Sequence, residues 1–315
     1  MTDLLAPPAL DSVDSALVDL LARLKASDYA FVTPTPTTHQ RVSARLPQAR
    51  AGHLRDIFGW GRPFQLSALE PGLLDCLQRA DGLVPDGVLH RSRLRVSTLD
   101  GRLHLQSSRG SEADSVFLGP DSYRFVHLLD AILREGPSPE RVLDIGAGAG
   151  AGALSLAARL QTATVVASDI NPRALRLLAA NAAHARLTVE VVEGSGLDAA
   201  AGDFDLITAN PPYVAGAGGR TYRDGGGSLG ADLALGWVEQ GLSRLRPGGR
   251  FVLYTGSPIV EGRDLLQGEL ARLAGAAGAS LSYEELDPDI FGGMLRQTAY
   301  REVERIAAVG AVLMR

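Results

Sequence analysis

The run Phe204-Asp205-Leu206-Ile207-Thr208-Ala209-Asn210-Pro211-Pro212-Tyr213 is the most informative stretch of this chain. Its apolar first half predicts a buried strand, and the two prolines predict a rigid turn at the end of that strand. The Asn210 side chain offers an acceptor and an NH2 donor in one plane, so it can hold a planar amide or amine nitrogen. Backbone carbonyls of the turn can accept hydrogens from the same nitrogen, and the Tyr213 ring can lie against a flat group. An ordinary strand-to-loop turn is the alternative, but Asn before the prolines and Tyr after them favour a functional turn.

The C-terminal two thirds of the chain alternate strand-like and helical runs. Strands are expected at 142–145, 164–169, 188–192, 205–208, 250–254, 279–286 and 306–313, and helices at 154–160, 172–185 and 231–245. Pro247-Gly248-Gly249 is expected to break the chain after the last of these helices. This order predicts an α/β, doubly wound, mainly parallel sheet over residues 111–315.

The first 110 residues have a different pattern. Helices are expected at 12–24 and 69–80, followed by a hairpin over 93–105 that turns at Asp100-Gly101. We therefore predict a smaller N-terminal α+β domain over residues 1–110, winged-helix-like in topology, that recognises the substrate.

A glycine-rich run, Asp144-Ile145-Gly146-Ala147-Gly148-Ala149-Gly150, lies between an expected strand and an expected helix. Glycines at this position let the backbone approach a nucleotide-type cofactor closely. The run also fits the dinucleotide fingerprint of nicotinamide enzymes. Asp144 favours another cofactor, because a carboxylate repels a pyrophosphate and attracts an ammonium group.

Two further positions lie at the ends of the next strands. Asp169, followed by Ile170, can accept hydrogen bonds from both hydroxyls of a ribose. Gly194-Ser195 follows the third strand, where an adenine could pack. Both positions suit either kind of cofactor.

Together these motifs resemble those of class I S-adenosylmethionine-dependent methyltransferases, in the "methyltransferase small domain" group. That group includes the release-factor glutamine N5-methyltransferases and members that act on nucleic acid bases. The resemblance covers residues 115–315 and implies a Rossmann-like, seven-stranded sheet with the last strand antiparallel. The Pro-Arg-Pro-Glu-Thr-Glu-like segment of the release-factor enzymes is not evident, and residues 117–125 stand in its place.

The resemblance implies S-adenosyl-L-methionine as the cofactor and no metal. The implied cofactor-binding residues are Asp144, Gly146, Ala147, Gly148, Gly150, Asp169, Ile170, Gly194, Ser195 and Asn210. The implied catalytic residues are Asn210, Pro211, Pro212 and Tyr213. Candidate substrate contacts are Tyr123, Arg124, Tyr222 and Arg223, the last two in a glycine-rich loop over 216–230. Trp60 and Trp237 are expected in the core or between domains.

We favour an N-methyltransferase that acts on a protein glutamine or a similar amide. The alternatives are a methyltransferase for an RNA or DNA base (adenine N6 or guanine N2), one for a small molecule, and a non-catalytic regulatory protein with a relic fold. The net charge of −5 counts against nucleic acid, since proteins that grip phosphates usually carry a basic excess.

Bulk properties limit the partners and the compartment. The 315 residues are 45% hydrophobic and 21% charged, which is ordinary for a globular protein. A single cysteine, Cys76, excludes an intramolecular disulfide and a cysteine-cluster metal site. No apolar run is long enough to span a membrane, and the N-terminus lacks the features of a signal peptide. A cytoplasmic location and no membrane partner are expected.

Overall fold

The computed structural model describes residues 12–45, 52–108, 114–213 and 230–315. Its α-helices are α1 (Ser12–Ala26), α2 (Pro36–Arg45), α3 (Pro71–Arg79), α4 (Pro120–Leu133), α5 (Ala151–Arg159), α6 (Pro172–Ala185), α7 (Asp232–Ser243) and α8 (Leu265–Ala277). Short helical turns are η1 (Arg55–Gly59), η2 (Leu66–Ala68), η3 (Gly292–Arg296) and η4 (Thr298–Tyr300). Among these residues, no helix has both the length and the apolar character that a membrane span requires.

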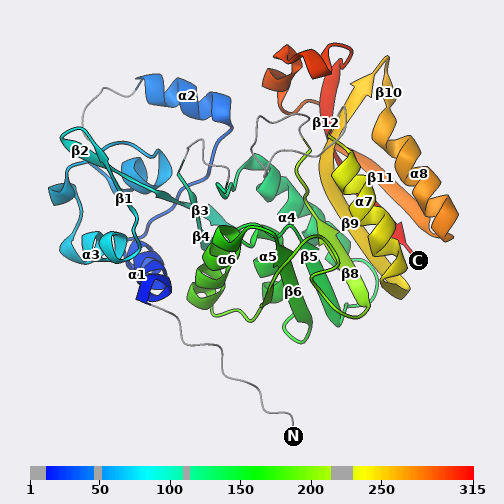
Figure 1. Ribbon diagram of the computed structural model, residues 1–315, viewed down its shortest axis with the longest axis horizontal. Coiled ribbons are helices and arrows are strands. Elements are labelled where there is room, and N and C mark those ends of the chain that lie inside the picture. Colours follow the sequence, from blue (N-terminus) through cyan, green and yellow to red (C-terminus); the bar gives the residue numbers. More distant parts are fainter. Residues whose placement is uncertain (1–11, 46–51, 109–113, 214–229) are drawn as a thin grey trace, which may run out of the picture.

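One large sheet organises the C-terminal part of the chain (Figure 1). Its strands are β5 (Arg141–Ile145), β6 (Thr164–Asp169), β7 (Glu190–Glu193), β8 (Phe204–Ala209), β9 (Leu245–Val260), β11 (Ser280–Asp287) and β12 (Arg305–Met314). They lie in the order β11-β12-β9-β8-β5-β6-β7, and the two-residue β10 (Arg263–Asp264) pairs with β9 outside this path. Strands β5 to β9 pair in parallel, whereas β12 is antiparallel to both neighbours. The expected α/β fold, with the last strand antiparallel, is confirmed.

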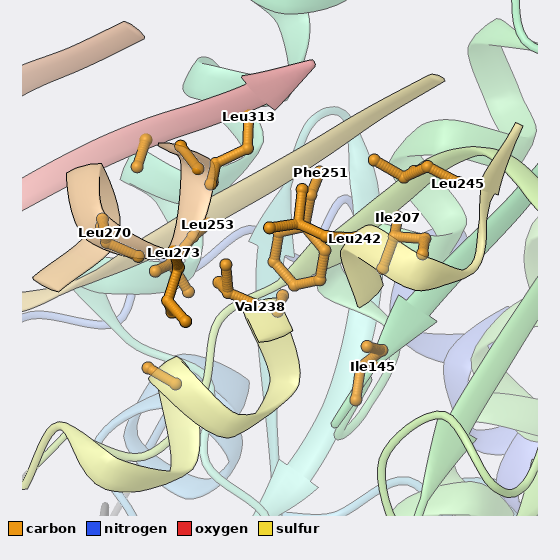
Figure 2. Close-up of a cluster of buried hydrophobic side chains, with 14 of the residues drawn as sticks. Ile145, Ile207, Val238, Leu242, Leu245, Phe251, Leu253, Leu270, Leu273 and Leu313 are labelled. Carbon is orange, nitrogen blue, oxygen red and sulfur yellow. The ribbon is translucent and has the colours of Figure 1, made fainter. Parts of the chain in front are cut away.

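Helices cover both faces of the central strands, whose successive side chains point to opposite faces of the sheet. Leu143, Ile207 and Phe251 belong to the core beneath α7 and α8, which Figure 2 shows in close-up. Neighbouring strand residues such as Val252 pack on the opposite face with α4 and α5. Helices on both faces make the sheet doubly wound, as predicted.

In the described residues of the N-terminal part, α1 to α3 and the turns η1 and η2 are followed by two separate hairpins. The hairpins are β1 (Leu83–Asp86) with β2 (Leu89–Ser92), and β3 (Leu94–Leu99) with β4 (Arg102–Ser107). Asp100 and Gly101 both have positive φ, 51° and 73°, as a two-residue type I′ turn requires. The predicted α+β character and the Asp-Gly hairpin are therefore observed, and the winged-helix topology stays a prediction.

The two parts of the chain share a hydrophobic core. Side chains of α1, α3, β3 and β4 cluster with Ala174, Leu177 and Ala180 of α6. The Asp100 carboxylate of the hairpin turn also accepts hydrogen bonds from Ser155 and Arg159 of α5, at 3.2 and 2.6 Å. The boundary predicted between residues 110 and 111 lies outside the described residues and stays a prediction.

One expected chain break proves to be an irregularity within a strand. We expected Pro247-Gly248-Gly249 to separate a helix from a strand, but α7 ends at Ser243 and β9 runs through these residues. The pairing with β8 skips from Leu245 to Arg250, so the extra residues loop out as a bulge. Gly248, with φ of 78°, supplies the left-handed conformation for this bulge.

Candidate active site

A cavity of about 410 Å³ lies at the carboxyl ends of the parallel strands. Because β5, β6, β7 and β8 run in the same direction, the loops that follow them meet at one edge of the sheet. The predicted residues that line the cavity are Asp144, Gly146, Ala147, Gly148, Asp169, Ile170, Gly194, Ser195, Asn210, Pro211, Pro212 and Tyr213. The structure thus brings four separate segments of the sequence to one cavity. Gly150 lies just behind it, as the N-cap of α5.

The glycine-rich loop is held in a conformation that side chains would not tolerate. Gly146, Gly148 and Gly150 have φ of 64°, 55° and 88°, in the left-handed region. A Cβ on Gly146 would also come within 2.8 Å of the Trp237 ring. A Cβ on Gly148 would meet no atom within 4 Å, so this backbone faces open space in the cavity. The loop leaves room for a ligand to lie directly against its backbone.

Asp144 is a fully buried carboxylate at the base of this loop. Its two oxygens accept hydrogen bonds from the Thr208 hydroxyl and from the Ala153 amide, each at 2.8 Å. Burial raises the pKa of Asp144 to about 7, and the nearby Asp169 adds to the rise, while the two hydrogen bonds oppose it. The ionised form is therefore costly in the ligand-free protein, and a cation in the cavity would stabilise it.

Asp169 links the second strand to the glycine-rich loop. One of its oxygens accepts from the Gly148 amide at 2.9 Å, and the other accepts from the Asn171 amide at 2.9 Å. Burial raises the pKa of Asp169, and these backbone hydrogen bonds oppose the rise. Ile170, the next residue, is 54% exposed and contributes an apolar side chain to the cavity lining.

The Asn-Pro-Pro-Tyr turn follows β8, the strand next to β5, and lines the cavity together with the glycine-rich loop. The Tyr213 ring meets the Phe291 ring edge-on, with centroids 5.4 Å apart. Its hydroxyl hydrogen-bonds to Asp121, whose Oδ1 also accepts from the Tyr254 hydroxyl at 3.0 Å. Burial raises the pKa of Asp121, while the hydrogen bond from Tyr254 opposes the rise. Asp121 itself lines the cavity.

The candidate substrate residues Tyr123 and Arg124 lie on α4, outside the cavity lining. The Tyr123 hydroxyl donates to the Thr98 carbonyl at 3.0 Å, so this side chain holds α4 against the N-terminal hairpin. Arg124 pairs with Asp287 at 2.6 Å, on the strand β11. Both side chains make contacts within the chain, and their role toward a substrate stays a prediction; Tyr222 and Arg223 lie outside the described residues.

The charged side chains that line the cavity are all acidic. Asp121, Asp144 and Asp169 contribute carboxylates, and the described lining contains no Lys, Arg or His. Such a cavity favours a cationic or neutral ligand over an anionic one. Within the same described residues, no group of His, Cys, Asp and Glu side chains is arranged to hold a metal ion.

Several lining residues were not predicted. Trp237 packs against the core, as expected, but it also lines the cavity over Gly146 and Gly196. Phe117 and Phe291 line it from segments before β5 and after β11. The Gly119-Pro120 helix start could have pointed to the first of these segments, because glycine and proline favour the N-cap and first turn of a helix.

The fold and the site together define an α/β protein with a nucleotide-type cofactor cavity at the carboxyl edge of its sheet. Residues 126–257 match the family model described as "Methyltransferase small domain". The resemblance predicted from the motifs is confirmed over this segment.

Curated relatives share this part of the chain. A release factor glutamine methyltransferase of Deinococcus radiodurans is 38% identical over 186 residues, which are 58% of this chain and 65% of that protein. A release factor glutamine methyltransferase of Koribacter versatilis is 35% identical over 150 residues, 43% of this chain and 54% of that protein. The matches thus cover between about half and two thirds of these two relatives.

Solved structures with a related arrangement are more distant in sequence. A methyltransferase from Pyrococcus furiosus is 19% identical with a TM-score of 0.43, over 64% of this chain and 88% of that one. A T. thermophilus 16S rRNA N2 methyltransferase, in complex with AdoMet and guanosine, is 20% identical with a TM-score of 0.47, over 79% and 63% of the two chains. At these values the likeness carries no further argument.

Proposed function

We propose that this chain is an S-adenosylmethionine-dependent N-methyltransferase whose acceptor is the side-chain amide of a protein glutamine. The observation that carries the proposal is the meeting of the glycine-rich loop, Asp169 and the Asn-Pro-Pro-Tyr turn on one cavity. The names of the curated relatives support the acceptor, since each described above is a release factor glutamine methyltransferase.

The cavity suits this cofactor by charge and by shape. S-adenosylmethionine carries a sulfonium and an ammonium group, and the cavity offers carboxylates without a lining cation among the described residues. Asp144 would lie near the ammonium group, Asp169 would take the ribose hydroxyls, and Ile170 would pack against the adenine. The bare backbone at Gly148 admits the ligand without a clash. When bound, S-adenosylmethionine supplies an electrophilic methyl group on a positively charged sulfur.

The Asn-Pro-Pro-Tyr turn would position the acceptor nitrogen. An amide nitrogen is a weak nucleophile because its lone pair is delocalised into the carbonyl group. Hydrogen bonds from its N–H groups to the Asn210 side chain and to the Pro211 carbonyl would return electron density to the nitrogen and spread its developing positive charge. Holding the nitrogen in this position also lowers the entropic part of the barrier to methyl transfer. No general base is assigned.

Other acceptors are alternatives to the proposed glutamine. An RNA or DNA base also presents a planar nitrogen, and so do some small molecules. The charged side chains of the described lining are acidic and disfavour a nearby phosphate, which supports an amide over a nucleotide. The cytoplasmic location expected from the sequence stays a prediction.

The test is transfer of labelled methyl from S-adenosylmethionine into an extract of cells that lack this gene. Wild-type protein is compared with Asn210→Ala, and each fraction is treated with protease or nuclease before counting. Label that depends on Asn210 and is lost with protease supports the proposal. Label that is lost with nuclease would indicate that the acceptor is a nucleic acid base. Label in the small-molecule pool would indicate that the acceptor is a metabolite.

Titration with S-adenosylmethionine provides the control for folding. Asn210→Ala should bind the cofactor about as well as the wild type, because the residues placed around the ribose and the ammonium group are intact. Absence of cofactor binding in the wild-type protein would instead support a relic fold.

A further inference from the structure

Phe291 adopts a backbone conformation that bulky residues rarely take. Its φ and ψ are 56° and 29°, in the left-handed region, and it is the N-cap of η3. Glycine adopts this conformation without strain, and two glycines, Gly292 and Gly293, follow directly. A large aromatic side chain is nevertheless placed at the strained position. Such strain is often concentrated at functional sites.

Hydrogen bonds to β12 and to α4 hold the segment that precedes Phe291. The Ile290 amide donates to the Ile306 carbonyl on β12 at 2.7 Å. Arg124 on α4 donates to the Asp287 carboxylate at 2.6 Å. These contacts hold the backbone of Phe291 between β12 and α4, so its conformation is set by the surrounding structure.

The Phe291 side chain is directed into the cavity next to the Asn-Pro-Pro-Tyr turn. It lines the cavity together with Met294, and its ring packs edge-on against Tyr213 at an interplanar angle of 68°. Residues 287–296 lie outside the matched family segment, 126–257. The family segment therefore supplies the turn, and a separate part of the chain supplies the apolar wall beside it.

We propose that Phe291 is a specificity-determining residue of the acceptor site, an inference that rests on the function proposed above. With Tyr213 and Met294 it forms an apolar wall for a flat, uncharged acceptor group. The carboxylate of Asp121 contacts the Tyr213 hydroxyl at this end of the described lining and pairs with Arg124 at 3.6 Å, so an acidic acceptor is disfavoured. A carboxamide fits this wall with its flat faces and reaches Asn210 with its N–H edge.

The experiment compares the wild type with Phe291→Gly and Phe291→Tyr, and uses a purified bacterial release factor as the acceptor. Phe291→Gly removes the ring but suits the left-handed backbone, so the protein should fold with a similar Tm. We expect its KM for the release factor to rise roughly fivefold to tenfold, which corresponds to one lost aromatic contact. Its Kd for S-adenosylmethionine should stay within roughly twofold of the wild type. Phe291→Tyr keeps the ring and should restore the KM.

The outcomes separate this inference from the proposed function. An unchanged KM in Phe291→Gly, with an active wild type, overturns the role of Phe291 alone. A fall in Tm accompanied by equal losses in cofactor and acceptor binding would also overturn it, since that pattern indicates a packing role. A wild-type protein that binds S-adenosylmethionine but does not methylate the release factor overturns the proposed acceptor, and this inference with it.

Discussion

Replacing Asp144 with asparagine should make the ligand-free protein more stable at neutral pH while it abolishes cofactor binding. Asp144 is 1% exposed, and its pKa is raised from 3.8 to about 7, chiefly by burial. Asparagine has the same shape and can keep both hydrogen bonds, accepting from the Ala153 amide and donating to the Thr208 hydroxyl. The substitution therefore removes the buried charge and leaves the packing intact.

The magnitude follows from the pKa of Asp144 in the two states. Between pH 3.8 and about 7 the native protein keeps a proton on Asp144 that the unfolded chain has lost. The stability of the wild type therefore falls as the pH rises through this window and is constant above it. The substituted amide does not titrate, so the free energy of unfolding of Asp144→Asn should exceed that of the wild type by ~4 kcal/mol at pH 8 and by less than half as much at pH 5.

Urea unfolding of the ligand-free proteins at pH 5 and pH 8 measures both differences. Asp205→Asn is the matched control: burial raises the pKa of Asp205, but hydrogen bonds from Arg141, Glu140 and Arg246 outweigh burial and hold that pKa below its usual range. That control should lose stability at pH 8. A less stable Asp144→Asn at pH 8, or a difference from the wild type that is equal at both pH values, would refute the reasoning.

Two further substitutions probe the cavity from its two ends. Asp169→Ala should weaken S-adenosylmethionine binding at least tenfold, by about 1.5 kcal/mol or more, since it removes a charged acceptor and frees the Gly148 amide; wild-type affinity in a titration would mean that the ribose lies elsewhere. Tyr213→Phe removes the hydroxyl that contacts Asp121 and should lower kcat roughly tenfold with little change in cofactor affinity. Steady-state kinetics decide the second case, and an unchanged kcat would show that the hydroxyl has no part in positioning the turn.

The sequence was sufficient to predict those features that depend on neighbouring residues. The central strands of the large sheet are visible as apolar runs because helices cover both of their faces. Asp100-Gly101 indicated a hairpin because few residues adopt positive φ, and the structure has positive φ at both. The glycine-rich loop and the Asn-Pro-Pro-Tyr turn were placed correctly at the ends of their strands.

The features that depend on tertiary packing could not be predicted from the sequence. Tyr123 contacts the hairpin because of how α4 packs on the N-terminal part, which no local pattern encodes. Trp237 reaches the cavity from α7, and Phe291 reaches it from the segment between β11 and η3. In one case a local signal was missed, because Asp86-Gly87 lies in the turn of the hairpin formed by β1 and β2.

The most direct test of the central claim is mass spectrometry of a purified bacterial release factor after incubation with this protein and S-adenosylmethionine. The account predicts one added methyl group on a glutamine side chain with the wild-type protein. It predicts no added methyl group with Asn210→Ala, although that variant binds the cofactor. Equal methylation by the two proteins would contradict the role given to the Asn-Pro-Pro-Tyr turn, and an unmodified release factor in both reactions would contradict the proposed acceptor.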